Sequence, residues 1–180
     1  MIYTINMRII SGQFKGRPLK SPKSDNIRPT GDKVKQALFT KLQFDIPNSI
    51  VLDLFSGSGA LGIEALSRGA KMVYFVDKDK RSIMLTKENL KGLPTNYKVL
   101  NCSYDIALNT IKEKFDLILV DPPYASGLYD NVMELIEKND LLSEDGNVVC
   151  EHPNELKVNS NLNLIDQKRY GTVTLTFFKK

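Results

Sequence analysis

The chain is organised around residues 51–62, which read Val51-Leu52-Asp53-Leu54-Phe55-Ser56-Gly57-Ser58-Gly59-Ala60-Leu61-Gly62. The run over 50–54 is apolar and rich in strand formers, and an amphipathic helical stretch follows over about 60–68. A strand that leads through a glycine turn into a helix N-terminus holds a ligand close to the backbone. The glycine spacing satisfies the dinucleotide-binding fingerprint, and Asp77 stands about 20 residues further on, where a ribose-binding acid is expected. This fingerprint alone does not name the cofactor.

Two acidic residues argue against a nicotinamide cofactor. Asp53 ends the first strand, where its carboxylate would repel a pyrophosphate but would hold the ammonium group of an amino acid. S-adenosylmethionine carries such an ammonium group and no phosphate. The second residue opens the motif Asp121-Pro122-Pro123-Tyr124, directly after the apolar run 115–120. This motif at the end of a strand is typical of methyltransferases that act on a planar exocyclic amine, so the two signals support each other.

Length and composition are those of an ordinary globular protein. At 180 residues the chain has room for one domain with a sizeable core plus an extension. Cys102 and Cys150 form neither a disulfide framework nor a metal-type spacing, so no metal is expected and a reduced, cytoplasmic setting is predicted. No stretch approaches 18 apolar residues and no signal peptide precedes the first motif, which predicts a protein without a membrane segment.

The net charge of +4 is unevenly distributed along the chain. Residues 1–41 hold nine lysines and arginines against two aspartates, a local charge of +7, which leaves −3 for the remainder. A basic segment on a nearly neutral body suggests a polyanionic partner. A solvated, lysine-rich surface would give the same excess of charge.

The basic segment is predicted to form a hairpin and then a helix. Short strands are expected over 8–10 and 16–20, around the turn 11–14. This hairpin and helix are predicted as an N-terminal RNA-binding unit over residues 1–46, and a methyltransferase domain is expected over 47–180.

The predicted helix follows a loop over 22–28. Thr30 can cap its start, and it is expected to run to about Leu42, with Asp32 in its first turn. Lys33 and Lys35 are expected to point away from its apolar face, which consists of Val34, Ala37, Leu38 and Leu42.

Strands and helices alternate from residue 49 onward. The predicted strands are 50–54, 72–76, 97–101 and 116–120, and the predicted helices are about 60–68, 79–91, 104–113 and 128–138. Alternation of this kind demands a parallel sheet with right-handed crossovers. Residues 146–151 supply a fifth strand, and alternation over 162–164 and 173–177 predicts a hairpin that adds an antiparallel strand. The expected fold is therefore α/β and Rossmann-like, with a mostly parallel seven-stranded sheet and an antiparallel C-terminal strand.

With these pieces placed, the chain resembles the bacterial small-subunit rRNA guanine-N2 methyltransferases that modify guanine 966 of 16S rRNA. The matching stretches are 7–12, 15–17, 28–30, 32–35, 52–70, 75–79, 115–124 and 169–171. The glycine loop and Asp-Pro-Pro-Tyr are shared by many amine methyltransferases, whereas Arg-Ile-Ile-Ser-Gly at 8–12 and Arg-Pro-Thr at 28–30 are more specific to this family. Family members usually begin near Met7, so residues 1–6 are expected to be an extension or a misassigned start.

The resemblance implies a class I S-adenosylmethionine-dependent methyltransferase that modifies the exocyclic N2 amine of a guanine in 16S rRNA. The implied partner is the small ribosomal subunit or its assembly intermediate, and the enzyme is expected to be a cytoplasmic monomer. One departure lies after the third strand, where the family commonly has Asp-Ala and this chain has Ser103-Tyr104, with Asp105 two residues late. Recognition of the adenine ring there is therefore expected to depend on backbone groups.

The residues expected to carry the chemistry fall into three sets. In the catalytic set, Asp121 and the Pro122 carbonyl accept the two N–H groups of an amine on an unstacked base, Pro123 has no N–H to compete, and Tyr124 stacks on the base. The cofactor set is Asp53, Phe55, Ser56, Gly57, Gly59, Asp77, Lys78 and Ser103, in which Asp77 would accept hydrogen bonds from the ribose hydroxyls. The RNA set is Arg8, Lys15, Arg17, Arg28, Thr30 and Lys33.

Alternatives within the same chemistry are an adenine-N6 and a protein glutamine-N5 methyltransferase. Adenine enzymes that act on DNA usually insert a target-recognition segment, for which the roughly 60 residues between the two motifs leave no room. Glutamine enzymes usually carry Asn where Asp121 stands. An alternative of another class is a non-catalytic RNA-binding or ribosome-assembly factor, which the intact Asp-Pro-Pro-Tyr motif opposes. His152, the only histidine, is predicted to be structural or to line the rim of the site.

Overall fold

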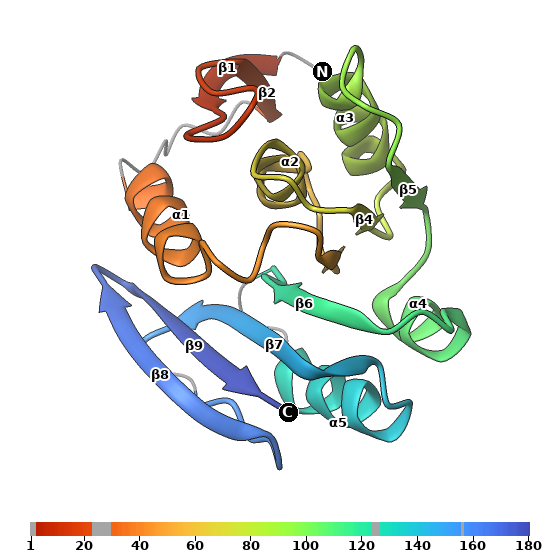
Figure 1. Ribbon diagram of the computed structural model, residues 1–180. Helices are drawn as coiled ribbons and strands as arrows, with labels where there is room; N and C mark the ends of the chain where they lie inside the picture. Colours follow the sequence, from red (N-terminus) through yellow and green to blue (C-terminus); the bar gives the residue numbers. More distant parts are fainter. Residues whose placement is uncertain (1–2, 23–29, 124–126, 156) are drawn as a thin grey trace.

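The computed structural model describes residues 3–22, 30–123, 127–155 and 157–180. In these ranges a seven-stranded sheet carries helices on both faces, and a separate two-stranded hairpin lies over one face (Figure 1). The strands that run parallel are β3 (Ile50–Asp53), β4 (Met72–Val76), β5 (Tyr97–Leu100), β6 (Phe115–Val120) and β7 (Leu142–Pro153). The sheet is completed antiparallel by β9 (Val173–Lys179), which pairs with both β7 and β8 (Asn163–Tyr170). The predicted Rossmann-like fold is confirmed.

The strand order places a reversal of chain direction in the middle of the sheet. The order is β5-β4-β3-β6-β7-β9-β8, so the chain builds outward from β3 to β5 and then returns to place β6 on the other side of β3. The two central strands end level, because Asp53 lies opposite Leu119 in the register of the pair. In open α/β sheets ligands bind at the carboxyl ends of the strands beside such a reversal.

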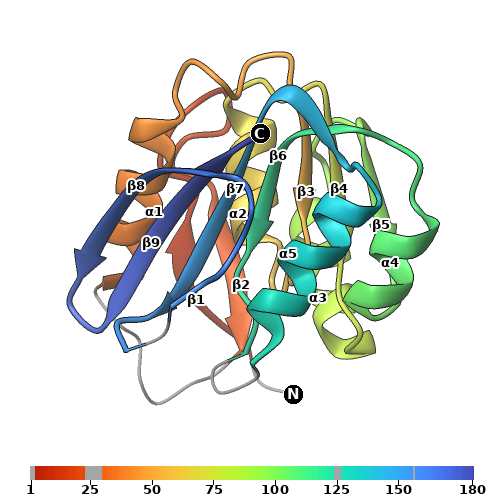
Figure 2. The ribbon, with the colours of Figure 1, turned by 90° about the horizontal axis from the view of Figure 1, so that it is seen from below.

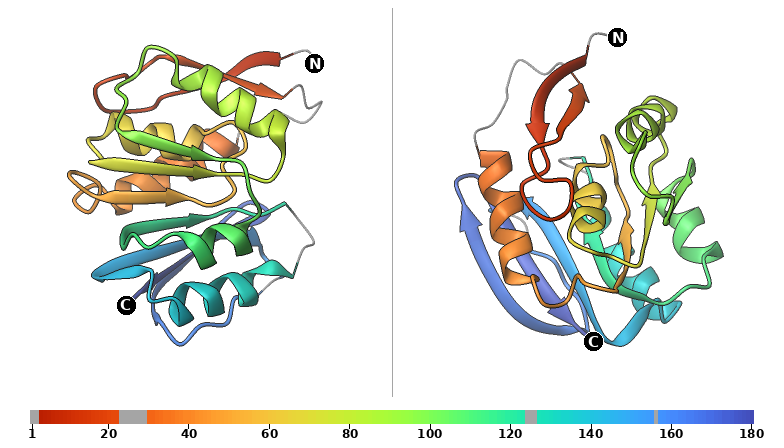
Figure 3. Two further views of the ribbon diagram at one scale, coloured as in Figure 1. Left: turned by 90° about the vertical axis from the view of Figure 1, so that its right-hand side faces the viewer. Right: turned by 45° about the horizontal axis from the view of Figure 1, so that its top comes forward.

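Two apolar layers cover the sheet. One layer holds α1 (Thr30–Lys41), α2 (Ala60–Ser67), α3 (Lys80–Leu90) and the hairpin of β1 (Tyr3–Arg8) and β2 (Pro18–Pro22). The other holds α4 (Tyr104–Thr110) and α5 (Leu128–Lys138), as Figures 1 and 3 show. Alternate residues of one strand enter opposite layers: Leu117 and Leu119 belong to the first, and Ile118 belongs to the second. Burial on both faces explains why these strands read as continuous apolar runs.

The predicted hairpin is present, but its two strands lie further from the turn than expected. Arg8 pairs with Pro18, and the ladder extends to Tyr3 opposite Pro22 instead of covering 8–10 and 16–20. The inner residues form a loop because their backbone N–H groups bond to α2: Ile10 donates to Glu64 (2.8 Å) and Gln13 to the Ser67 carbonyl (2.7 Å).

Other boundaries shift by a few residues. The helix predicted over 104–113 ends at Thr110, because Ile111 already has extended backbone (φ −68°, ψ 133°). The fifth strand is longer than the predicted 146–151, since its start pairs with β6 at Phe115 and its end pairs with β9 at Val173. The helix over 128–138 and the strand over 72–76 have the predicted bounds.

The prediction that Lys35 points away from the apolar face is wrong. Its side chain is only 6% exposed, and its Nζ donates to the Arg8 carbonyl (2.7 Å) and lies 3.7 Å from Glu64 Oε2. Burial lowers the pKa of Lys35, although the charge of Glu64 opposes this shift. The error arises because α1 is covered on more than one side: Phe39 is fully buried beside Leu38, while the predicted face residue Ala37 is only half-buried.

Glu64 of α2 fastens the N-terminal segment to the sheet. Its side chain is fully buried and accepts hydrogen bonds from the backbone N–H groups of Ile10 (2.8 Å) and Ser11 (3.0 Å) and from Arg68 Nε (2.9 Å). Ile9, Leu19 and the apolar face of α1 belong to the same buried cluster as residues of the central strands. The elements of residues 1–46 therefore share the core of the sheet.

We expect Gly12→Ala to destabilise the protein strongly, because Gly12 has a φ of +85° and a Cβ there would lie 1.9 Å from the Ser67 carbonyl oxygen. The positive φ and the overlap together should lower the free energy of unfolding by about 2–4 kcal/mol in urea titrations. Gly16→Ala is the matched control, because Gly16 has a φ of +86° but no neighbour within 4 Å of such a Cβ. It should cost only about 1 kcal/mol. Equal losses in both variants would show that the loop does not pack against α2 as described.

Candidate functional site

The turn between β3 and α2 is tight, and each of its glycines has a physical reason. Gly57 and Gly59 have φ of +54° and +79°, in the left-handed region that favours glycine. Gly62 has ordinary φ, but a Cβ there would lie 2.3 Å from the ring of Phe75, so it allows α2 to pack closely on β4. The Ser56 N–H donates to the Val76 carbonyl (2.9 Å), which ties the turn to the end of β4.

Two carboxylates hold the ends of this turn. Asp53 Oδ2 accepts the N–H of Gly62 (2.9 Å), and Asp77 Oδ2 accepts the N–H of Gly57 (2.9 Å). Asp77 Oδ1 also accepts the N–H of Asp79, at 2.8 Å. Both predicted ligands therefore shape the loop itself. Each carboxylate oxygen has a second lone pair, so both residues can still accept from a bound molecule.

Asp53 titrates near neutral pH. Its residue is only 3% exposed, and burial raises its pKa from 3.8 to about 7, with the Gly62 hydrogen bond opposing and the charge of Asp77 adding to the shift. A cation placed beside Asp53 would favour the ionised form and lower this pKa. The site is thus suited to a ligand that brings a positive charge.

The remaining predicted cofactor residues lie along the same edge of the sheet. The Ser56 hydroxyl is buried and has no hydrogen-bond partner among the described residues, which is the state expected of a group that pairs with a ligand. The half-buried ring of Phe55 lies 5.7 Å from the ring of Tyr104, and Ser103 immediately precedes α4. Lys78 is exposed. Asp53, Phe55 and Ser56 therefore lie at the carboxyl end of β3, with Lys78 just beyond the end of β4.

The second motif lies beside the first. Asp121 directly follows β6 and is half-buried, Pro122 is buried and Pro123 is exposed. Tyr124 lies outside the described residues. Burial, and then the charges of Glu151 and Asp53, raise the pKa of Asp121 well above its ordinary value. Asp121 therefore faces the same acidic environment as the glycine turn.

Glu151 was not predicted from the sequence. It belongs to β7, and the register pairs the preceding residue, Cys150, with Val120, so Glu151 and Asp121 occupy adjacent positions at the ends of neighbouring strands. Only the sheet order, which places β7 next to β6, could have identified it.

Two further unpredicted residues come from α3. Thr86 Oγ1 donates to the Gly57 carbonyl (3.0 Å), and Asn89 Nδ2 donates to the Ser58 carbonyl (2.9 Å). The buried Asn89 side chain also accepts the N–H of Lys20 (2.8 Å) and donates to the Lys20 carbonyl (2.9 Å). One amide thus joins the glycine turn to the N-terminal hairpin. No motif marks Thr86 or Asn89 in the sequence.

The predicted RNA residues differ in exposure and in the contacts they make. Arg8, Lys15 and Lys33 are exposed. Arg17 is half-buried, and its guanidinium donates to the carbonyls of Asn89 and Lys91 at the C-terminal end of α3. Arg28 lies outside the described residues, and Thr30 is the first residue of α1.

His152 is structural. It is fully buried, and its ring nitrogens lie 2.7 Å from Thr176 Oγ1 and 2.9 Å from the Pro153 carbonyl oxygen. Burial lowers its pKa, which keeps the ring neutral. Over the described ranges, no group of three or more His, Cys, Asp or Glu side chains is arranged to hold a metal ion. No helix within the same ranges is long and apolar enough to cross a membrane.

Comparisons with known proteins agree with this geometry. The family model described as Conserved hypothetical protein 95 matches residues 7–179. Ribosomal RNA small subunit methyltransferase D of Escherichia coli K12 is 34% identical over 181 residues, covering 97% of this chain and 90% of that protein. The solved structure of yhhF from Escherichia coli is 34% identical, with a TM-score of 0.85 over 97% of each chain. A Thermus thermophilus 16S rRNA N2 G1207 methyltransferase, solved with AdoMet and guanosine, shares the fold (TM-score 0.77, 20% identity, 100% of this chain and 51% of that one).

We expect Asp53→Asn to flatten the pH dependence of stability. Between about pH 4 and 7 the folded protein keeps a proton on Asp53 that the unfolded chain releases, so the free energy of unfolding contributed by this group falls as the pH rises. The loss across this window amounts to at most about 4 kcal/mol. Asn still offers an oxygen to the Gly62 N–H but does not titrate. Urea unfolding of the wild type and of Asp53→Asn at pH 5 and pH 8 measures the difference. Identical pH dependence in the two proteins would refute the raised pKa of the buried Asp53 carboxyl.

Proposed function

Because the chain belongs to the family of ribosomal RNA small subunit methyltransferase D, we propose that it transfers a methyl group from S-adenosylmethionine to the exocyclic N2 amine of a guanine in 16S rRNA. The observation that carries the proposal is the meeting of two loops at the reversal of the sheet. The glycine turn braced by Asp53 and Asp77 lies beside Asp121-Pro122, because β3 and β6 are neighbours and end level. The motif resemblance points to guanine 966 as the target.

On the cofactor side, S-adenosylmethionine supplies an electrophilic methyl group when it is bound. Ionised Asp53 would hold its ammonium group, and Asp77 would accept hydrogen bonds from the ribose hydroxyls. The buried Ser56 hydroxyl would gain the partner that the described protein residues do not give it.

On the base side, the chain must position a weak nucleophile, because the lone pair of an aromatic amine is delocalised into the ring. Asp121 and the Pro122 carbonyl would accept its two N–H groups and aim the nitrogen at the methyl group. The raised pKa makes Asp121 a stronger base, so its carboxylate can take the proton that the methylated nitrogen must lose. Tyr124 is proposed to stack on the base.

Three further parts of the proposal concern the setting. The exposed Arg8, Lys15 and Lys33 are proposed to contact RNA phosphates, with Arg28 and Thr30 near the target base. Arg17 is the weakest member of this set, because its guanidinium already bonds to the end of α3. We propose that the enzyme works in the cytoplasm as a monomer, on the small ribosomal subunit or its assembly intermediate.

The reaction is tested with methyl-labelled S-adenosylmethionine and 16S rRNA, both free and in small subunits. Label should enter the rRNA, and mass spectrometry of digested rRNA should place it on one guanine N2. Asp121→Ala should lower turnover by a factor of 100 or more, because the proton acceptor is lost. Asp145→Ala removes an equal charge from an exposed side chain near the start of β7 and should leave turnover unchanged.

Other products would identify the alternatives. Label on adenine N6 would show an adenine methyltransferase, and label on a glutamine of a protein would show a glutamine-N5 methyltransferase. If the protein binds rRNA but transfers no methyl group to free 16S rRNA or to small subunits, it is a non-catalytic assembly factor.

Calorimetry distinguishes the cofactor from a nicotinamide. S-adenosylhomocysteine should bind, whereas NADH should not, because the Asp53 carboxylate at the glycine turn repels a pyrophosphate. Lys71→Ala should leave that preference intact, since Lys71 is exposed and precedes β4, at the end of the strand away from the turn. Tighter binding of NADH would overturn the assignment.

A further inference from the structure

A groove of about 500 Å³ lies between α1 and β8, the strand at one side of the sheet. Its walls come from opposite ends of the chain, and most of the residues that line it have polar side chains. The lining residues are Lys33, Gln36, Ala37, Thr40, Lys41, Lys168 and Tyr170.

The groove has an excess of positive charge. Three lysines line it, and of the carboxylates in the described residues Asp166 forms ion pairs with two of them, 2.7 Å from Lys41 Nζ and 3.9 Å from Lys168 Nζ. Lys41 Nζ also lies 5.1 Å from the centre of the Phe177 ring, so this ammonium is held in place. Lys33 is exposed and the Lys168 side chain is 59% exposed, which lets both meet an anion from solvent.

The groove opens toward the edge where the reaction site lies. Because β9 is antiparallel to β7 and β8 is antiparallel to β9, β8 runs in the direction of the parallel strands and ends at their carboxyl edge. Tyr170 lies opposite Val173, which lies opposite Pro153 at the end of β7. In Figure 2 the start of α1 and the end of β8 lie together on the lower side of the molecule. Three strand spacings, about 15 Å, separate β8 from β6.

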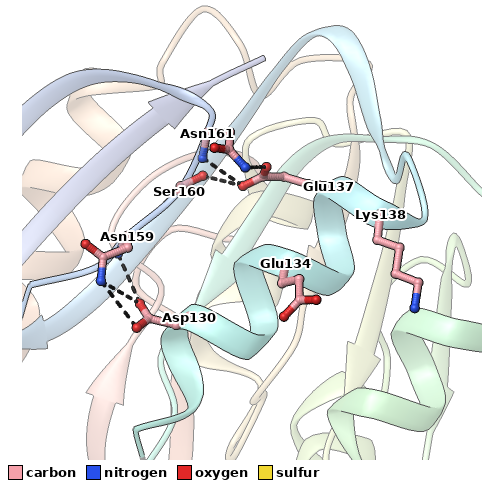
Figure 4. Close-up of a pocket in the computed structure, with 7 residues that line it drawn as sticks. All are labelled: Asp130, Glu134, Glu137, Lys138, Asn159, Ser160 and Asn161. Carbon is pink, nitrogen blue, oxygen red and sulfur yellow. Dashed lines mark hydrogen bonds between the residues drawn. The ribbon is translucent and has the colours of Figure 1, made fainter.

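A second pocket shows that this charge is not a general property of the surface. It lies along α5, which covers the opposite face of the sheet, and it has three carboxylates for one lysine (Figure 4). Asn159 donates to Asp130, and Ser160 and Asn161 donate to Glu137. A phosphodiester chain that reaches the carboxyl edge would be repelled by the α5 side and attracted to the α1 side.

We propose that the groove between α1 and β8 binds the sugar-phosphate backbone of the RNA strand that flanks the target nucleotide. Lys33 and Lys168 contact phosphates at the open end, and the half-buried Tyr170 ring between them gives a base or sugar an apolar surface. This inference rests on the proposed function, because it takes rRNA as the substrate. It adds Lys168 and Tyr170, from the C-terminal hairpin, to the residues that contact RNA.

The test is the salt dependence of binding to transcribed 16S rRNA, measured with S-adenosylhomocysteine present and without turnover. In Lys33→Ala/Lys168→Ala, loss of two phosphate contacts should lower the slope of log K against log salt by about 1.4 for a single strand. If the curves meet near 1 M salt, the affinity at 0.1 M should fall roughly 25-fold. The matched control is Lys71→Ala/Lys112→Ala, which removes the same charge from exposed positions before β4 and β6, at the opposite edge of the sheet.

The outcomes separate this inference from the proposed function. If the wild type methylates 16S rRNA and the two double variants have the same salt slope as the wild type, the groove does not bind RNA although the proposed function stands. An equal reduction of the salt slope in both double variants would also overturn the proposed role of the groove, because the effect would then follow net charge alone. If the wild type binds rRNA and transfers no methyl group, the function fails, and a slope lowered only in the groove variant still supports the groove. If Lys33→Ala/Lys168→Ala keeps its affinity for rRNA but loses binding to a ribosomal protein, the groove binds that protein and the proposal of an RNA backbone is wrong.

Discussion

The hydrogen bond from the Gly62 N–H to the buried Asp53 carboxylate is the interaction around which the site is built. It joins the last residue of β3 to the first turn of α2 and so fastens the glycine turn between them. Asp77 closes the other side through Gly57, and the ends of β3 and β4 thereby fix one loop between two carboxyl groups. The cost is that a charged group is held out of water, which raises the Asp53 pKa to about 7. A cationic ligand relieves that cost, so the same bond that shapes the loop also creates an affinity.

The parallel part of the sheet could be predicted because both of its faces are buried. Each central strand is then a short apolar run with an aspartate at its end (Asp53, Asp77 or Asp121), and the run over 115–120 could be read directly. Strand ends that depend on pairing with distant strands were harder to predict from the sequence. The true length of β7 follows from pairing with Phe115 on one side and Val173 on the other, and neither contact is local in sequence. The hairpin strands shifted for the same reason, since acceptors on α2 take the backbone donors of Ile10 and Gln13.

The site divides along a similar line. Asp53, the glycine turn and Asp121 lie in motifs whose chemistry is local, so the sequence alone could propose them, and the sheet order places them side by side. Glu151 and Asn89 act through position alone. Nothing around them in the sequence marks one as the neighbour of Asp121 in the sheet, or the other as a support of the glycine turn. Residues of this second kind can be found only after the fold is known.

A count of charge along the sequence does not show which cations of the N-terminal segment already have partners within the protein. Several of its cations are already engaged: Lys35 is buried beside Glu64, Arg17 bonds to the end of α3, and Lys20 pairs with Glu88 at 3.0 Å. The described part of the segment is therefore bound to the rest of the domain. Its backbone is bonded to Glu64, and Asn89 connects Lys20 to the Ser58 carbonyl of the glycine turn. A cation mounted on this framework keeps a fixed position relative to the glycine turn, so a phosphate held there would set the distance from the RNA backbone to the methyl donor.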